Sequence, residues 1–200
     1  MLFRSGEYHY FTVHEPKERL ICAAPFRERV LHHAVINLCG PVLERAAVAD
    51  SYACRVGKGQ TGAVERAAHF ARRHGWFLKL DIRKYFDSVD HQVVLRLLAR
   101  KFKDRPVLTL FEKLLRTYSS QPGRGLPIGN LSSQHLANAY LGPLDRWVKE
   151  TLGIGAYVRY MDAFVLWHDD REVLREAWRQ SADFLHRELR LELKPTGQIN

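Results

Sequence analysis

Cysteine is scarce in this sequence, and the cysteines that occur form no recognisable motif. The 200 residues include Cys22, Cys39 and Cys54, and no two of them have CxxC spacing. This pattern excludes a disulfide framework and a zinc site, so we expect buried, reduced thiols of a cytosolic protein. The ten histidines contain no HExxH motif, which excludes the helix-borne zinc site of metalloproteases.

Long apolar runs are missing as well. No stretch of about 18 apolar residues occurs, so we expect no membrane-spanning helix. The start of the chain, MLFR, lacks the apolar region of a secretory signal peptide. We therefore expect a soluble, cytoplasmic protein with no membrane partner.

Acidic residues are outnumbered by basic ones. Lys and Arg number 31 against 22 Asp and Glu, which gives a formal net charge of +9. Such an excess favours a polyanionic partner, because each phosphate contact releases counterions. With 46% hydrophobic and 26% charged residues, the chain can fold as one domain or as two small subdomains that share a core.

Hydrophobic periodicity predicts a mixture of strands and helices. Alternating aromatic and polar residues over 7–23 predict a β-hairpin with a basic tip. Apolar spacings of three and four predict a helix over 25–48, which Pro41 would kink or divide. Further along we expect a glycine-rich loop at 57–62, helices at 63–74, 90–102, 105–118 and 131–152, a strand at 76–82, a hairpin at 156–167 and a helix to about Leu189.

Two segments place a carboxylate at the end of an apolar strand. Asp81 ends the strand in LKLDI, and Asp162 lies in YMDAF near a hairpin turn. A lone charge there is costly without a cation or hydrogen bonds. If adjacent strands bring the two together, they form an oxygen site suited to Mg²⁺, and two such ions can activate a 3′-hydroxyl and neutralise pyrophosphate. The alternative is that each is a turn or cap residue, which is our interpretation of Asp90, Asp169 and Asp170.

Four motifs give these carboxylates a context. SYACR at 51–55, DIRKYF at 81–86, GLPIGNLSSQ at 125–134 and YMD at 160–162 occur in this order. Together they resemble prokaryotic reverse transcriptases, most closely those of diversity-generating retroelements, with group II intron-like enzymes next. The resemblance runs from about Tyr8 to the end of the chain.

The resemblance implies roles for the residues around Asp81 and Asp162. Both aspartates would be catalytic and hold two Mg²⁺ ions, with Mn²⁺ as an alternative, and the carbonyl of Ile82 would be a further metal ligand. The backbone amides of Lys84 and Tyr85 would bind the triphosphate of the incoming deoxynucleotide.

By the same resemblance, Phe86 occupies the place of the aromatic steric gate. A ring beneath the sugar leaves no room for a 2′-hydroxyl, so deoxynucleotides are selected. RNA-dependent RNA polymerases need a polar group there instead. The alternative for Phe86 is ordinary core packing.

Basic residues in the N-terminal third resemble nucleotide and template contacts. Lys17 and Arg19, near the hairpin tip, resemble fingers residues that close over the triphosphate, although a solvated turn is the alternative. Arg55 and Lys58 lie in a loop that resembles a template-contacting segment. The glycines around Lys58 do not have P-loop spacing.

The 125–134 motif carries the subtype assignment. Most reverse transcriptases have Gln-Gly and Ser-Pro where this chain has Ile128-Gly129 and Ser133-Gln134. The aliphatic-Gly and Ser-Gln form resembles the enzymes of diversity-generating retroelements, which miscopy adenines. Ile128 and Gly129 would line the nucleotide site, and Ser133 and Gln134 would contact nucleic acid.

Two departures from the family pattern matter. Ala163 stands where the family has the second aspartate of its Tyr-Met-Asp-Asp box, so we expect this chain to be inactive or badly impaired. Lys194 resembles the palm lysine that protonates pyrophosphate, but the chain ends soon afterwards, and we expect it to be a fragment lacking the thumb.

The resemblance therefore implies an α+β polymerase right hand, with an antiparallel palm sheet and helices on one of its faces. Residues 1–75 would form the fingers and 76–200 the palm, with some fingers helices at 90–125. The expected activity is RNA-directed DNA synthesis from an RNA template, a DNA or RNA primer and deoxynucleoside triphosphates, with an accessory RNA-binding protein as a further candidate partner. The alternatives are a non-catalytic nucleic-acid-binding relic that serves as a scaffold or defence component, and an RNA polymerase or primase, against which Phe86 argues.

Overall fold

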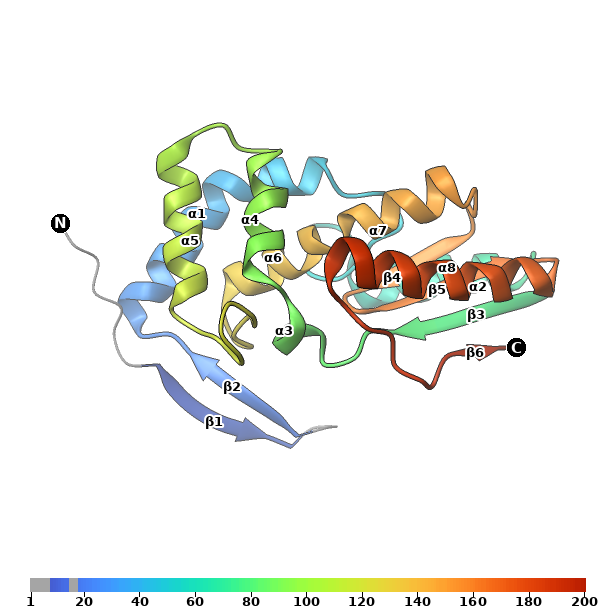
Figure 1. The fold of residues 1–200 in the computed structure, drawn as a ribbon, viewed down its shortest axis with the longest axis horizontal. Helices are drawn as coiled ribbons and strands as arrows, with labels where there is room; N and C mark the ends of the chain where they lie inside the picture. Colours follow the sequence, from blue (N-terminus) through green and yellow to red (C-terminus); the bar gives the residue numbers. More distant parts are fainter. Residues whose placement is uncertain (1–7, 15–17) are drawn as a thin grey trace.

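The computed structural model describes residues 8–14 and 18–200, and its first element is a hairpin. Strand β1 (His9–Val13) pairs antiparallel with β2 (Arg19–Ala23), and Tyr10 lies opposite Cys22. Figure 1 shows the hairpin extending from one end of the molecule. The predicted hairpin is confirmed, while Lys17, which we expected near its tip, lies outside the described residues.

A four-stranded antiparallel sheet forms the other end of the molecule. Its strand order is β4-β5-β3-β6, so the strand that carries Asp81 is central. The strand at 76–82 and the hairpin at 156–167 are both confirmed. The strands are β3 (Trp76–Asp81), β4 (Tyr157–Tyr160), β5 (Ala163–His168) and β6 (Gln198–Ile199).

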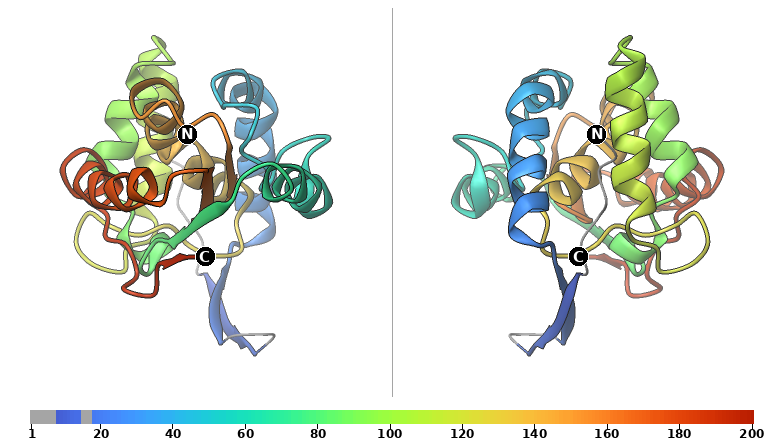
Figure 2. Two further views of the ribbon diagram at one scale, coloured as in Figure 1. Left: turned by 90° about the vertical axis from the view of Figure 1, so that its right-hand side faces the viewer. Right: turned by 90° about the vertical axis from the view of Figure 1, so that its left-hand side faces the viewer.

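Helices cover both faces of this sheet, and the expectation of helices on one face is wrong. Alternate residues of β5 enter two different cores: Phe164 and Leu166 join one, and Val165 and Trp167 join the other. Helix α8 (Arg171–Leu189) packs on the first face and α2 (Gly59–Ala71) on the second, as Figure 2 shows in its left view. Because both faces of β5 are apolar, each needs a covering helix.

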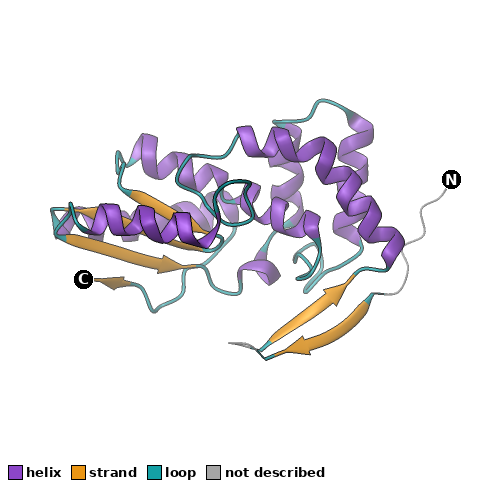
Figure 3. Cartoon of the chain, turned by 180° about the vertical axis from the view of Figure 1, so that it is seen from behind, coloured by secondary structure: helices purple, strands orange, loops and turns teal. Residues whose placement is uncertain are grey.

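A group of helices joins the hairpin to the sheet. Helix α1 packs against α6, and α4 packs against both α5 and α6. Figure 3 shows this helical part between the hairpin and the main sheet. The four are α1 (Phe26–Arg45), α4 (His91–Ala99), α5 (Arg105–Arg116) and α6 (Leu131–Tyr140).

Several local expectations are corrected. Helix α1 continues through Pro41 instead of dividing there. The helix expected over 131–152 is three segments: α6, then α7 (Gly142–Arg146), then a π-helical turn, η1 (Trp147–Thr151). Pro143 in the first turn of α7 has no N–H to continue the ladder of α6. Gly62 lies inside α2 and not in a loop, and a short helix, α3 (Tyr85–Ser88), was not predicted.

The cap interpretations are confirmed for two aspartates. Asp90 accepts hydrogen bonds from the amides of Gln92 and Val93, at 3.0 and 3.1 Å, at the start of α4. Asp170 accepts from the amide of Glu172 at 2.8 Å at the start of α8. Both carboxylates cap helix N-termini. Asp81 and Asp162 therefore remain the candidates for chemistry.

The described residues contain neither a helix that could span a membrane nor a disulfide. No helix there combines the length and the apolar character that crossing a bilayer requires. The three cysteines, all within the described residues, form no disulfide; Cys22 and Cys39 are buried, as expected, but Cys54 is exposed.

Candidate active site

Asp81 and Asp162 lie at the same end of the main sheet. Asp81 is the last residue of β3, and Asp162 lies in the turn that leads directly into β5, the neighbour of β3. The amide of Ile82 donates to the carbonyl of Asp162 at 3.3 Å, which ties the two segments together just beyond the ladder. Residues 81 apart in the sequence are therefore brought to one site by a single strand pairing.

The charge of Asp81 acts on Asp162. The pKa of Asp162 is raised above its ordinary value, first by burial and then by the negative charge of Asp81. Lys194 and Arg19 act in the opposite direction. Burial and the neighbouring carboxylate thus both disfavour the ionised form of Asp162, a cost that a bound cation would offset.

Lys194 is the direct partner of Asp81. Its ammonium lies 2.6 Å from Oδ1 of Asp81, and both side chains are about one third exposed. Its amide also donates to the carbonyl of Asp81 at 2.8 Å, and the preceding Leu193 bridges to Ile82. The segment after α8 thus runs antiparallel to the end of β3 and brings the Lys194 ammonium to the candidate site.

The positive charge of Arg19 also acts on Asp162. Arg19 is exposed at the start of β2, and its charge lowers the pKa of Asp162. The start of β2 is therefore within electrostatic reach of Asp162.

A buried network beneath the Asp162 turn was not anticipated from the sequence. Arg159 and Asp145 are 1% and 0% exposed, and they form a two-pronged ion pair with N–O distances of 2.6 and 2.7 Å. The hydroxyl of Tyr157 donates to the same carboxylate at 2.7 Å. Burial alone would lower the pKa of Arg159, but Asp145 raises it, so the guanidinium stays charged.

This network fixes the turn. Arg159 donates to the carbonyl of Met161 at 2.8 Å and to Oδ1 of Asn138 at 3.0 Å. Met161 has φ of +55°, a conformation uncommon for a side-chain-bearing residue. An arginine inside the apolar strand YVRY was the available sequence signal, because a charge there must have a buried partner.

In the segment after Asp81, Tyr85 is buried and hydrogen-bonded, whereas Lys84 is exposed. The hydroxyl of Tyr85 donates to the carbonyl of Ala137 at 2.5 Å, deep in the core. Lys84, which caps α3, has φ of +43° and an exposed side chain. Phe86 is half-buried and packs on the main core, so core contact and a sugar-facing edge are both compatible with its position.

The 125–134 motif contacts strand β2 of the hairpin. The amide of Cys22 donates to the carbonyl of Ile128 at 2.8 Å. Gly129 has φ of +119°, and a Cβ there would lie 3.0 Å from Cγ2 of Ile21. Glycine is required at 129 for both reasons. Ser133 is buried and Gln134 is half-buried in the first turns of α6.

Arg55 and Lys58 are already engaged within the protein. The side chain of Arg55 is 8% exposed; its guanidinium pairs with Glu44 at 2.7 Å and donates to the carbonyl of Ser51 at 2.7 Å. The ammonium of Lys58 donates to the carbonyl of Ala49 at 2.6 Å. Their predicted template contacts stay predictions, and any phosphate would have to compete with these partners.

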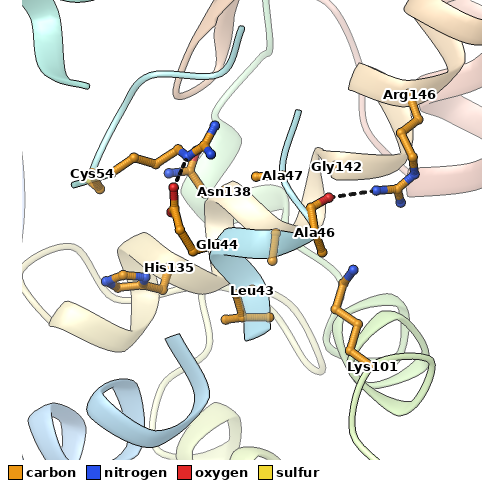
Figure 4. A pocket seen from close by; sticks show the side chains of 12 residues that line it. Leu43, Glu44, Ala46, Ala47, Cys54, Lys101, His135, Asn138, Gly142 and Arg146 are labelled. Carbon is orange, nitrogen blue, oxygen red and sulfur yellow. Dashed lines mark hydrogen bonds and ion pairs between the residues drawn. The ribbon is translucent and has the colours of Figure 1, made fainter. Parts of the chain in front are cut away.

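Arg55 lines a narrow pocket at the end of α1 (Figure 4). Glu44, the partner of Arg55, lies on one side of it, and Arg146 donates to the carbonyl of Ala46 at 3.0 Å on the other. Its volume of about 20 Å³ holds a water molecule, not a nucleotide. This pocket is therefore not the substrate site.

Comparison with known proteins identifies the kind of domain. Residues 14–196 match the family described as reverse transcriptase (RNA-dependent DNA polymerase). A putative COX1/OXI3 intron 1 protein of Saccharomyces cerevisiae is 24% identical over 136 residues, which is 64% of this chain and 16% of that protein. The group II intron-encoded protein LtrA of Lactococcus lactis is 36% identical over 84 residues, which is 36% of this chain and 13% of that protein. The chain thus spans less than a fifth of these relatives.

Solved structures bear out the expected fold. Apo telomerase from Candida tropicalis has a TM-score of 0.71 at 8% identity, and the match covers 96% of this chain and 44% of that one. Telomerase from the same organism with a TWJ fragment of telomeric RNA gives 0.68 at 8% identity, over 100% and 42%. The α+β fingers-and-palm architecture is therefore confirmed.

Proposed function

This chain belongs to the reverse transcriptase (RNA-dependent DNA polymerase) family, and from that premise we propose that it is the fingers and palm of an RNA-directed DNA polymerase. Residues 1–75 are assigned to the fingers and 76–200 to the palm, with fingers helices within 90–125. The observation that carries the proposal is the placement of Asp81 and Asp162 at one end of a sheet whose strand pairing brings them together.

The donor set fits divalent cations. Asp81 and Asp162 supply carboxylate oxygens, and the carbonyl of Ile82 supplies another, which is the ligand type that Mg²⁺ and Mn²⁺ prefer. The raised pKa of Asp162 supports this fit. Bound cations would offset both the cost of burying its negative charge and the repulsion from Asp81. When bound, such ions supply activation of the primer hydroxyl and neutralisation of the leaving group.

The residues around the carboxylates would position the nucleotide. Lys84 is the N-cap of the short helix α3 and Tyr85 is its first residue, and the first backbone amides of a helix have no partner within the helix, so those of Lys84 and Tyr85 would bind the triphosphate. Phe86 would exclude the 2′-hydroxyl, and Arg19 would approach the triphosphate from the hairpin, together with Lys17. Lys194, whose ammonium lies 2.6 Å from Asp81, would transfer a proton to the leaving pyrophosphate.

Ala163 would disable this chemistry. In the described residues, no group of three or more His, Cys, Asp or Glu side chains is placed to hold a metal. The two aspartates therefore face the charge of two cations without the third carboxylate that the family box supplies. We propose that template binding persists in this chain, whereas nucleotidyl transfer fails.

The subtype is proposed from two positions. Ile128 and Gln134 support an enzyme of the diversity-generating retroelement type, since an aliphatic side chain at 128 cannot donate a hydrogen bond to the nascent base pair. The curated relatives are intron proteins and a maturase, so the competing assignment is a group II intron-like enzyme. Copying errors concentrated at template adenines would favour the first, and uniform fidelity the second.

Primer extension tests the activity. The comparison is between the chain as it stands and Ala163→Asp, each with a polymerase thumb appended after Asn200, on an RNA template with deoxynucleoside triphosphates and Mg²⁺. We expect DNA synthesis from Ala163→Asp alone. If neither makes DNA although both bind template, the non-catalytic relic is the better description.

A further inference from the structure

Helix α1 carries an apolar ridge on the face that is turned away from the rest of the protein. Every fourth residue along this face is apolar and exposed: Phe26, Val30, Ala34 and Leu38. The exposed fractions are 72% for Phe26, 53% for Val30 and 81% for Leu38. Residues four apart form a continuous row along a helix, and this row is about 18 Å long. Figure 2 shows α1, in blue, at the surface of the molecule in its right view.

The ridge is separate from the face of α1 that builds the core. That inner face includes Val35, Cys39 and Leu43, which are 5% to 6% exposed. The outer surface is instead shallowly hollowed over about 520 Å³ along one side of the ridge. Single exposed apolar side chains are common on proteins, whereas a contiguous set of them marks an interaction surface.

Exposed arginines flank the ridge. Arg27, Arg29 and Arg45 are all exposed on α1, and none of the three has an ion pair in the described part of the chain. The guanidinium of Arg29 lies over the ring of Phe26, 5.8 Å from its centre. The outer face of α1 is therefore apolar along its middle and cationic at its margins.

The glutamates of α1 do not offset these cations, which disfavours a second copy of the chain as the occupant. Glu28 is buried, and Glu44 pairs with Arg55 at 2.7 Å. Because arginines stand near both ends of the helix, two copies of this face would bring arginine against arginine in either orientation. Like charges brought together across an interface cost free energy.

Nucleic acid also fits this face poorly. Bases stack on aromatic side chains, but Val30, Ala34 and Leu38 are aliphatic, so three of the four ridge residues offer no stacking surface. A phosphate backbone would pair with the arginines and leave the ridge in water. A helix with apolar residues on one side and carboxylates beside them satisfies both features, because its apolar side fits the ridge and its carboxylates pair with the guanidinium groups.

We propose that the outer face of α1 docks an acidic amphipathic helix of a partner protein, with the apolar side of that helix on the ridge and its carboxylates against Arg27, Arg29 and Arg45. The length of the ridge corresponds to about 12 residues of the partner helix. An interface of this size is below that of most stable complexes, so we expect a dissociation constant in roughly the micromolar range. The docking face includes none of the residues assigned to nucleotidyl transfer, so it does not depend on the polymerase proposal.

The test is fluorescence anisotropy with a labelled synthetic peptide of about 16 residues, which has leucine at the a and d positions of its heptads and glutamate at the flanking positions. Its twin has lysine in place of each glutamate. We expect the chain to bind the acidic peptide and not the twin. Arg27→Glu combined with Arg29→Glu should reverse this preference, and Leu38→Ser should weaken binding of the acidic peptide by about tenfold.

Matched controls lie on and just after α2. Arg72→Glu combined with Arg73→Glu changes the net charge by the same amount at exposed positions, and Val64→Ser alters an apolar side chain that is 59% exposed. Neither should change binding of the acidic peptide. Circular dichroism verifies that every variant keeps its fold.

Several outcomes would overturn the inference. These are no binding of the acidic peptide to the parent chain, equal binding of both peptides, and losses in the α2 controls as large as those in the α1 variants. Self-association of the parent that Leu38→Ser abolishes in sedimentation would assign the face to a second copy. Binding of an RNA oligonucleotide or of anionic vesicles that is weakened by Leu38→Ser but not by Val64→Ser would assign it to those ligands instead.

Discussion

Asp81 and Ala163 are cross-strand partners at the end of the β3–β5 ladder. Residues directly opposite in an antiparallel pair point to the same face, with Cβ atoms about 5 Å apart. A carboxylate at position 163 would therefore stand next to that of Asp81, and a methyl group takes its place. From this register we predict that a carboxylate at position 163 would strengthen metal binding.

The buried ion pair should be necessary for folding stability. Arg159→Met leaves Asp145 buried with only the Tyr157 hydroxyl as a neutral donor. We expect the free energy of unfolding to fall by about 3–5 kcal/mol, measured by urea denaturation. Arg175→Met, which removes an exposed i,i+3 pair with Glu172, should change it very little. Comparable losses in the two variants would mean that the buried network contributes nothing special.

Gly129 should be irreplaceable because of its backbone. Gly129→Ala places a Cβ 3.0 Å from Ile21 at φ of +119°, so we expect a loss of about 1–3 kcal/mol and faster amide exchange at Cys22. Gly155→Ala is the control, since its Cβ would meet no atom within 4 Å. Hydrogen exchange that is unchanged at Cys22 would show that the hairpin does not depend on this contact.

Ionised Asp162 should destabilise the fold. Because its folded pKa lies above the ordinary value of 3.8, the folded state holds the proton more tightly than the unfolded state does. The free energy of unfolding should therefore fall as pH rises from 3.8 through the raised pKa. Asp162→Asn should be more stable than the parent at pH 7, and the difference should vanish below pH 3.8. A difference independent of pH would point to packing instead of charge.

Phe86 should control sugar selection in the Ala163→Asp protein with a thumb appended. Phe86→Val shortens the side chain that faces the sugar in our proposal, so ribonucleotide use should rise by about tenfold or more while deoxynucleotide use changes less. Single-nucleotide extension measures both. Unchanged discrimination would leave Phe86 as a core residue only.

Patterns confined to short segments predicted most of the fold. The alternation in 156–167 located β4 and β5, and the strand ending at Asp81 followed from its apolar residues and Gly75. Helix boundaries were less predictable where one residue decides them. Pro143 separates α7 from α6, but Pro41 is accommodated within α1.

Patterns within short segments could not predict the contacts between segments that are distant in the sequence. The covering of the second sheet face by α2 depends on where Phe70 and Trp167 meet. The Arg159–Asp145 pair and the shared use of Asp90 by Arg124 and Arg190 likewise arise from tertiary packing. For the candidate site, the sequence and its resemblance singled out Asp81, Asp162 and Lys194, whereas the Asp81–Lys194 pair, the raised pKa of Asp162 and the supporting network required the structure.

Metal binding by this chain tests the central claim most directly. Mn²⁺ titration followed by electron paramagnetic resonance should compare the chain, Ala163→Asp, and Ala163→Asp combined with Asp81→Asn. A control, Val56→Asp, adds a carboxylate at a site that is 94% exposed. We predict that Ala163→Asp binds Mn²⁺ about tenfold more tightly than the parent, that Asp81→Asn abolishes the gain, and that Val56→Asp gives none. Equal Mn²⁺ affinity in the parent and Ala163→Asp would contradict the assignment of position 163 as a lost metal-binding carboxylate.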